Sequence, residues 1–236
     1  MAANEVAARQ QPERFGYISE ERSTRTGGHL WREKVVETQD GALRRLVAVD
    51  GHPLTAAETE AESHRIDDLV RHPDELRRLD KAHKDDEARA TALLQLLPKA
   101  FLLTPDGEID GCTRFSFSPS PSFHPSSYEE RVAHAIGGTV SVRLPMDRLC
   151  TLEGHILHPV EFGFGLLGQI DQGGSFQMKR ISIDGPNWKT ERMSVHLGGR
   201  IFMLKSIARD LETIRTEIHL VPLNLTLSQA AQLIHP

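Results

Sequence analysis

The sequence has few features of membrane-spanning or nucleic-acid-binding proteins. No apolar run approaches about 18 residues, the length that a helix needs to cross a bilayer, so no transmembrane segment is expected. The formal net charge of -5 is small and gives no basic surface for nucleic acid or for an anionic membrane. A hydrophobic content of 39% with 26% charged residues is typical of a globular chain.

Cysteine is scarce: the chain has 2 cysteines, Cys112 and Cys150. Each lies inside a predicted strand, so a disulfide between neighbouring strands and two separate buried thiols both fit the sequence. Neither CxxC nor a Cys/His spacing typical of zinc sites is present.

The 12 histidines also lack the sequence spacing that is typical of residues that bind one metal ion. His64, His72 and His83 are not spaced to share one turn of a helical face. His155 and His158 are three residues apart in a predicted strand and therefore point to opposite faces. We expect no metal site.

The motifs of common enzyme classes are missing as well. There is no Gly-x-Ser-x-Gly elbow, no P-loop and no dinucleotide fingerprint, and Gly163-Phe164-Gly165 is too short to hold a phosphate. We therefore expect no catalytic residues, no cofactor and no enzymatic activity.

The first residues lack the basic start and apolar segment of a signal peptide. Two locations follow from this. The protein is expected in the periplasm or cell envelope if an export signal has been removed, and in the cytoplasm if Met1 is its natural start.

What is present is a succession of strand-like runs between Gly137 and Pro222, with no helical period. Turn residues such as Gly173-Gly174 and Gly198-Gly199 separate the runs, a pattern that predicts consecutive hairpins. The predicted strands are Thr139–Leu144, Leu149–His158, Ser175–Asp184, Asn187–Leu197 and Arg200–Leu220.

The N-terminal part predicts a short helix over Ala2–Arg14 and then three strands, separated by Gly27-Gly28 and by Gln39-Asp40-Gly41. These strands are Phe15–Arg25, His29–Thr38 and Ala42–Val49. Further along, Ala100–Thr104 and Thr113–Ser118 are strands, with turns expected at Pro105–Gly107 and at Asp110-Gly111. Short helices are expected over Tyr128–Ile136 and Leu225–Ile234.

A charged helical insertion is expected over residues 54–97. Thr55 is a predicted N-cap with Glu58 at the capping-box position, and Pro73 divides the insertion into two helices. From Glu58 to Arg89 there are 11 acidic and 7 basic residues. Such a sequence fits either a solvated helical hairpin or a lid over a cavity.

These elements predict a single domain over residues 1–236 of the mainly β, α+β class. Because strands twist, a long antiparallel sheet curls, and we expect a strongly curved sheet that forms an open half-barrel with the helical hairpin inserted and short terminal helices.

Several stretches resemble the lipoprotein-carrier superfamily typified by LolA, LolB and LppX, and most of all its uncharacterised bacterial outer membrane lipoprotein-sorting protein-like branch. They are Leu46–Leu54, His158–Gly165, Asn187–Lys189 and Gly199–Lys205. The likeness extends over residues 12 to 222. It implies an incomplete β-barrel of about eleven strands with helices over its mouth, in an exported protein that holds acyl chains.

The resemblance implies non-catalytic binding of a hydrophobic ligand, either a lipid or the acyl chain of an acylated protein, in the bacterial cell envelope. The internal cysteines and the long charged insertion favour a general lipid-binding role over lipoprotein transport. The candidates for lining an acyl-chain cavity are Phe115, Phe117, Phe162, Phe164, Phe176, Met178, Trp188, Phe202 and Leu204. If they instead fill a core, an interaction scaffold with partner-docking helices is the alternative, and an unrecognised hydrolase is the third hypothesis.

Overall fold

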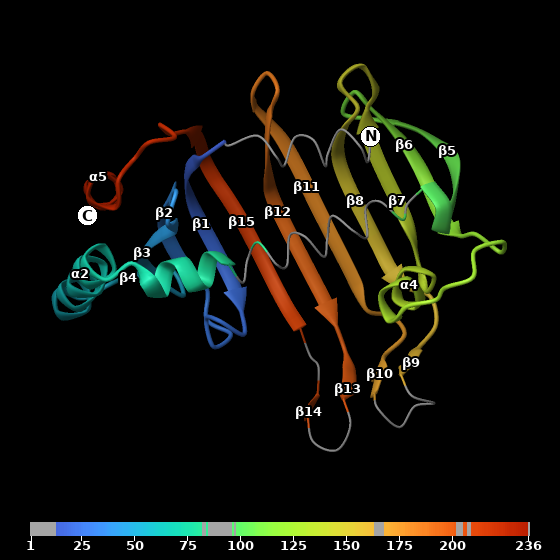
Figure 1. Cartoon of the computed structure of the whole chain (residues 1–236), viewed down its shortest axis with the longest axis horizontal. Coiled ribbons are helices and arrows are strands. Elements are labelled where there is room, and N and C mark those ends of the chain that lie inside the picture. Colours follow the sequence, from blue (N-terminus) through green and yellow to red (C-terminus); the bar gives the residue numbers. More distant parts are fainter. Residues whose placement is uncertain are drawn as a thin grey trace. The chain divides into compact units, whose positions relative to one another are not determined.

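The computed structural model of the chain describes residues 13–81, 84, 96, 98–162, 168–201, 205–206 and 209–235 (Figure 1). The expected helix over Ala2–Arg14 lies almost wholly outside these residues, and so does the end of the expected helical insertion between residues 85 and 95.

Strands dominate the described chain and helices are few and short, which confirms the predicted mainly β class (Figure 1). The helices that lie wholly within the described residues are α2 (Ala56–Arg71), α4 (Tyr128–Ala133) and α5 (Leu227–Leu233), with a 3-10 turn at Leu144–Met146. The strands are β1 (Phe15–Ser23), β2 (Trp31–Thr38), β3 (Gly41–Val49), β4 (His52–Pro53), β5 (Phe101–Ile109), β6 (Cys112–Pro119), β7 (Ile136–Arg143), β8 (Arg148–Ile156), β9 (Val160–Phe162), β10 (Gly168–Ile170), β11 (Ser175–Asp184), β12 (Asn187–Leu197), β13 (Gly199–Ile201), β14 (Lys205–Ser206) and β15 (Arg209–Leu220).

Most strands belong to one 11-stranded sheet with the order β4-β3-β2-β1-β15-β12-β11-β8-β7-β6-β5. The order follows the chain in two meanders, and the late strand β15 lies beside the first strand, β1. The pairs β1–β2, β2–β3, β5–β6, β6–β7, β7–β8 and β8–β11 are antiparallel. The large antiparallel sheet is thus present, while its curvature into a half-barrel stays a prediction.

The chain divides into two compact units. The first unit comprises Met1–Gln10, Arg89–Ile181 and Arg192–Leu211, and the second comprises Gln11–Ala88, Ser182–Glu191 and Glu212–Pro236. Each unit has its own hydrophobic clusters, as described below.

The helical insertion begins as the sequence predicts. Thr55 caps α2: its side chain accepts a hydrogen bond from the Glu58 amide, and the Glu58 carboxylate accepts one from the Thr55 amide. The helix ends at Arg71, with His72 as its C-cap before Pro73, and residues 74–81 are helical again. These findings confirm the capping box and the division at Pro73, because a proline cannot continue the hydrogen-bond ladder of a preceding helix.

The sparse apolar positions of these helices pack with residues of β2 and β3 in one hydrophobic cluster of the second unit. The closing helix α5, capped by Thr226, packs into the same cluster. Ile66 and Leu43 have less than 2% of their surface exposed, so this cluster holds the insertion against the sheet by hydrophobic burial. Its buried members are Val36, Leu43, Ile66, Leu76, Leu225, Leu227, Ala230 and Ile234.

Two expectations about strands are wrong. The expected strand Arg200–Leu220 is divided into β13, β14 and β15, and the first two belong to a separate 4-stranded sheet of short strands with β9 and β10. The expected turn at Pro105–Gly107 is an irregularity inside β5, where the pairing with β6 shifts between Pro105 and Glu108. Gly107 has a φ of 91°, so it absorbs the extra residues without ending the strand.

The open question about the cysteines is settled by a disulfide between Cys112 and Cys150, whose Cα atoms are 6.7 Å apart. Cys112 begins β6 and Cys150 lies on β8, so the bond joins the two strands that flank β7. Cys150 is skipped in the pairing of β7 with β8, since Ser141 pairs with Thr151 and the next residue of β7 pairs with Leu149. The disulfide therefore sits at a bulge.

We expect the disulfide to stabilise the protein chiefly by restricting the unfolded chain. For a sequence separation of 38, the loop-closure estimate is about 4 kcal/mol. The double variant C112S/C150S should therefore lose about 3 to 4 kcal/mol of unfolding free energy in a urea titration monitored by circular dichroism. An unfolding midpoint equal to that of the disulfide-bonded wild type, measured without reductant, would contradict this expectation.

Candidate functional site: an apolar face and a charged face

One face of the first unit carries a row of apolar side chains across four neighbouring strands. Phe115 of β6 pairs with Val140 of β7, Val140 pairs with Leu152 of β8, and Leu152 pairs with Met178 of β11. Directly paired residues point to the same side of a sheet, so these four side chains form one continuous apolar row.

A second row runs beside the first, two residues along each strand and therefore on the same face. Here Phe117 pairs with Gly138, Gly138 with Gly154, and Gly154 with Phe176. The Phe176 ring occupies the space over Gly154: a Cβ atom at residue 154 would lie 2.4 Å from the ring. A glycine is required there, because any side chain would displace the phenyl ring.

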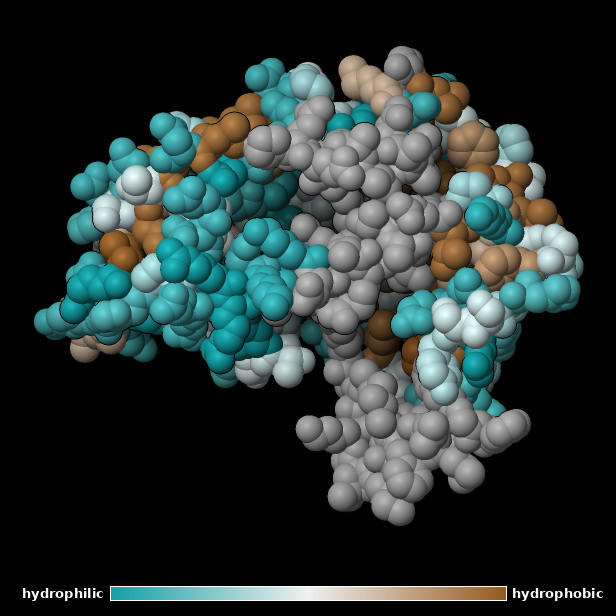
Figure 2. Space-filling view, viewed as in Figure 1, coloured by the Kyte–Doolittle hydropathy of each residue, from teal (hydrophilic) through white to brown (hydrophobic). Residues whose placement is uncertain are grey.

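The two rows, which we call the apolar face, are packed at one end and partly open at the other. Phe117 and Val140 are buried, and Phe117 makes an edge-to-face contact of 5.2 Å between ring centroids with Phe101. Phe115, Leu152 and Met178 are only partly buried against this cluster. Figure 2 shows apolar side chains at the surface over the β5–β8 part of the sheet.

Of the nine predicted cavity-lining residues, Phe115, Phe117, Phe176 and Met178 are brought together on the apolar face. Trp188 lies elsewhere, buried in the second unit with 6% of its surface exposed. Phe162 ends the short strand β9, and its side chain is outside the described part of the structure. Phe164, Phe202 and Leu204 are also outside it.

A hollow of about 420 Å³ lies in the first unit. Four of its eight lining residues, Glu153, His155, Ser175 and Gln177, alternate with those of the apolar face along β8 and β11, so they belong to the opposite, polar face. Gln177 donates a hydrogen bond of 2.9 Å to Glu153 in this lining. The lining consists of Glu153, Gly154, His155, Ser175, Phe176, Gln177, Ser194 and His196.

The hollow borders a Ser-His-Asp array that the sequence analysis missed. The Ser194 hydroxyl is 2.9 Å from Nε2 of His196, and Nδ1 of His196 is 3.2 Å from a carboxylate oxygen of Asp210. The order of groups is that of a nucleophile, a base and an orienting acid. However, 48% of the His196 side chain and 76% of the Asp210 side chain are exposed, so water competes for each hydrogen bond.

We expect the Ser194 array to be catalytically inactive, because activation of a serine depends on a desolvated, fixed base. Hydrolysis of p-nitrophenyl butyrate by the wild type should equal that of the S194A variant and the buffer rate, in a spectrophotometric assay. A wild-type rate well above the buffer rate that S194A abolishes would show that the array is a hydrolytic site.

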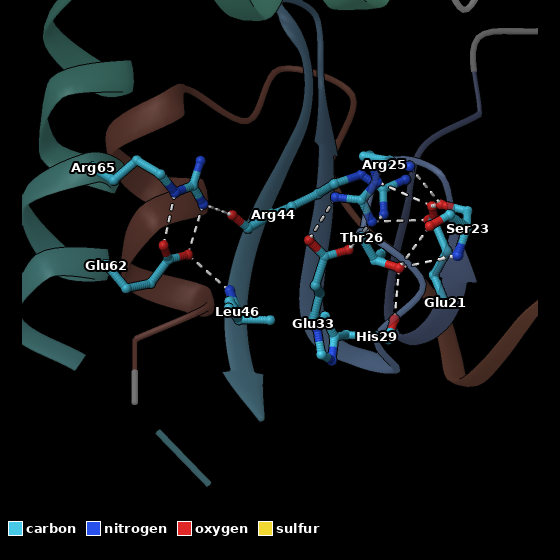
Figure 3. A network of polar contacts seen from close by, with 10 residues as sticks. All are labelled: Glu21, Ser23, Arg25, Thr26, His29, Glu33, Arg44, Leu46, Glu62 and Arg65. Atoms are coloured by element: carbon cyan, nitrogen blue, oxygen red, sulfur yellow. Dashed lines mark hydrogen bonds and ion pairs between the residues drawn. The ribbon is translucent and has the colours of Figure 1, made fainter. Parts of the chain in front are cut away.

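The second unit presents a different surface, built from alternate residues of β1 and β2. Glu33 has only 3% of its surface exposed and accepts two hydrogen bonds from Arg25, of 3.0 and 2.8 Å (Figure 3). Arg44 of β3 adds a third contact to Glu33 at 3.1 Å. A buried carboxylate needs such partners, because leaving water is costly for an unpaired charge.

Glu21 occupies the other side of the Arg25 guanidinium (Figure 3). It also accepts a hydrogen bond of 2.6 Å from the Ser23 hydroxyl. Burial raises the pKa of Glu21, but the hydrogen bonds from Arg25 and Ser23 and the positive charges of Arg25 and Arg44 outweigh it, so this pKa lies below its ordinary value. Glu21 is therefore ionised at neutral pH.

The aromatic rings of Phe15 and Tyr17 lie on the same side of β1 as Glu21. Nζ of Lys189 lies 2.6 Å from Glu37, and it stands over the rings of Phe15 and Tyr17 at 4.6 and 5.7 Å. The guanidinium of Arg215 also lies over the Tyr17 ring, at 5.3 Å. These contacts favour cations through the ring quadrupoles. We call the set Glu21, Arg25, Glu33, Glu37, Arg44, Lys189 and Arg215 the charged face.

Helix α2 is attached to the edge of this region by a second polar group. Glu62 accepts hydrogen bonds from the Leu46 amide at 2.8 Å and from Arg65 at 2.7 and 2.6 Å (Figure 3). Arg65 in turn donates to the carbonyl of Arg44. The carboxylate of Glu62 thus fixes the insertion to β3 through the backbone.

Replacing Glu33 tests the energetic importance of the charged face. The E33A variant leaves Arg25 and Arg44 without their shared partner, so it should lose about 3 kcal/mol of unfolding free energy. The matched control is E20A, since Glu20 is a half-exposed neighbour 3.9 Å from Arg32, and it should cost less than about 1 kcal/mol. Equal losses for both variants in a denaturant titration would contradict the assignment.

Comparison with known proteins found no matching family model, no matching curated protein and no matching solved structure. In the part of the chain that the structure describes, no helix is long and apolar enough to cross a membrane. Within that same part, no group of three or more His, Cys, Asp or Glu side chains is placed to hold a metal ion. The resemblance to lipoprotein carriers therefore stays a prediction.

Proposed function

We propose that the protein binds the acyl chain of a lipid or of an acylated protein, without catalysis, in the bacterial cell envelope. The observation that carries the proposal is the row Phe115, Val140, Leu152 and Met178, in which four strands present apolar side chains side by side. Three of these side chains are only partly buried within the described structure.

The apolar face has the dimensions and chemistry for a flexible hydrocarbon. Neighbouring strands are about 4.8 Å apart, so a row across four strands extends about 14 Å. Each CH₂ group removed from water contributes about 0.8 kcal/mol. A chain laid along the row is therefore held by burial alone, and the Met178 thioether adapts to its shape.

Two further observations support the proposal. The 11-stranded antiparallel sheet with a helical insertion agrees with what the lipoprotein-carrier resemblance implies, an incomplete barrel of about that size. The Cys112–Cys150 disulfide is typical of proteins in oxidising compartments, which include the periplasm. In this proposal the sheet curves around the ligand as an open half-barrel.

The second candidate function is an interaction scaffold, and the packed end of the apolar face favours it. Phe101, Phe117, Ala133 and Leu149 are all buried in one cluster at that end. If such filling extends over the whole face, the protein holds its shape for a partner protein instead of a lipid. Ligand binding distinguishes the two functions.

Two adjacent residues of β11 provide the test, since they point to opposite faces of the sheet. M178E places a charge in the apolar row, whereas Q177E places the same charge on the polar face. We expect M178E to weaken binding of a fluorescent fatty acid about tenfold or more, because a methionine contact is lost and a carboxylate is desolvated. Q177E removes the hydrogen bond to Glu153 on the polar face, but a folded Q177E should bind as the wild type does, because that face does not contact the ligand.

The measurement is a fluorescence titration, with circular dichroism to show that each variant is folded. Failure of the wild type to bind the fatty acid would favour the scaffold. Equal affinity of M178E and the wild type for the fatty acid would show that the apolar face is not the binding site.

A further inference from the structure

Arg215 is the cation of the charged face that has no carboxylate partner among the described residues. Arg25 and Arg44 are paired with Glu21 and Glu33, and Lys189 is paired with Glu37. Arg215 instead donates from Nη1 to the Thr190 carbonyl at 3.1 Å and lies over the Tyr17 ring. Its Nε–H group is buried and has no hydrogen-bond partner in the described structure.

Ser19 provides a second unused donor, on the strand next to the one that carries Arg215. It follows Tyr17 by two residues on β1, so both side chains point to the same face of the strand. Only 1% of Ser19 is exposed, and its Oγ also has no partner among the described residues. Arg215 belongs to β15, the strand next to β1 in the sheet.

Two buried donors without acceptors are costly, since each has given up its hydrogen bonds to water. The carboxylates nearby are already occupied: Glu21 and Glu33 by arginines, and Glu37 by Lys189, the Phe15 amide and the Tyr17 hydroxyl. The three carboxylates are matched by three cations, so Arg215 leaves one positive charge in excess.

We propose that Ser19 and Arg215 form a binding site for an oxyanion, that is, a phosphate or carboxylate group. One oxygen accepts from the Arg215 Nε–H, and the Ser19 hydroxyl donates to the same group. A guanidinium matches the geometry of carboxylate and phosphate oxygens, and such charge-assisted hydrogen bonds are the stronger kind. The site lies wholly in the second unit and does not rest on the proposed acyl-chain function.

The anion can be a free ion or the headgroup of an amphiphile. Titration calorimetry of the full chain with sodium phosphate, sodium laurate and lauryl alcohol separates these sources, at constant ionic strength and below micelle-forming concentrations. Binding of phosphate indicates a free anion, and binding of laurate more tightly than the alcohol indicates an amphiphile headgroup. Both results support the site.

Three variants test the residues. R215Q should weaken anion binding about tenfold or more, and S19A should weaken it several-fold, whereas lauryl alcohol should bind each variant as it binds the wild type. R192Q is the matched control, because Arg192 is an exposed arginine of β12 in the first unit, and it should leave all affinities unchanged.

The S19A variant is expected to fold, so it keeps the test valid if R215Q does not fold. Removing a hydroxyl that has no partner should leave the melting temperature unchanged or raise it. Failure of the wild type to bind phosphate and to prefer laurate over the alcohol would overturn the site. Unchanged anion affinity in S19A, or equal losses in R192Q and R215Q, would overturn it as well. Failure to bind the alcohol bears only on the acyl-chain proposal.

Discussion

The antiparallel register of β6, β7, β8 and β11 is the constraint on which the apolar face depends. Side chains alternate between the two faces of a strand, so a slip of one residue in any pair would move an apolar row to the polar face. The pairings Val140 with Leu152 and Leu152 with Met178 keep the rows aligned. The disulfide of Cys150 lies at the bulge of the same strand pair, where β8 has an extra residue.

The same alternation produces the opposite chemistry in the second unit. On β1 and β2 the inward positions hold Glu21 and Glu33 beside the apolar Tyr17 and Val35. Burying these carboxylates is tolerable because Arg25 contacts both of them, Arg44 also contacts Glu33, and Ser23 also donates to Glu21. Hydrocarbon suits the face of the first unit, whereas the second unit favours charged groups.

Local signals in the sequence were sufficient for the helices α2, α4 and α5 and for part of the apolar face. The capping box of Thr55 depends on residues three apart, and the alternation of Phe115 and Phe117 identifies one face of a strand. Contacts between distant segments could not be predicted in this way. The pairing of Glu33 with Arg44 depends on register, and the division of Arg200–Leu220 depends on a second sheet whose strands are two or three residues long.

The central claim is that the apolar face holds an acyl chain in the native protein. Its most direct test is mass spectrometry of an organic extract of the purified protein. The protein is exported to the periplasm of a bacterial host and purified without detergent. The account predicts acyl lipids in roughly stoichiometric amounts, since each buried CH₂ adds about 0.8 kcal/mol to retention. An extract without lipid, from protein that is folded and disulfide-bonded, would contradict it.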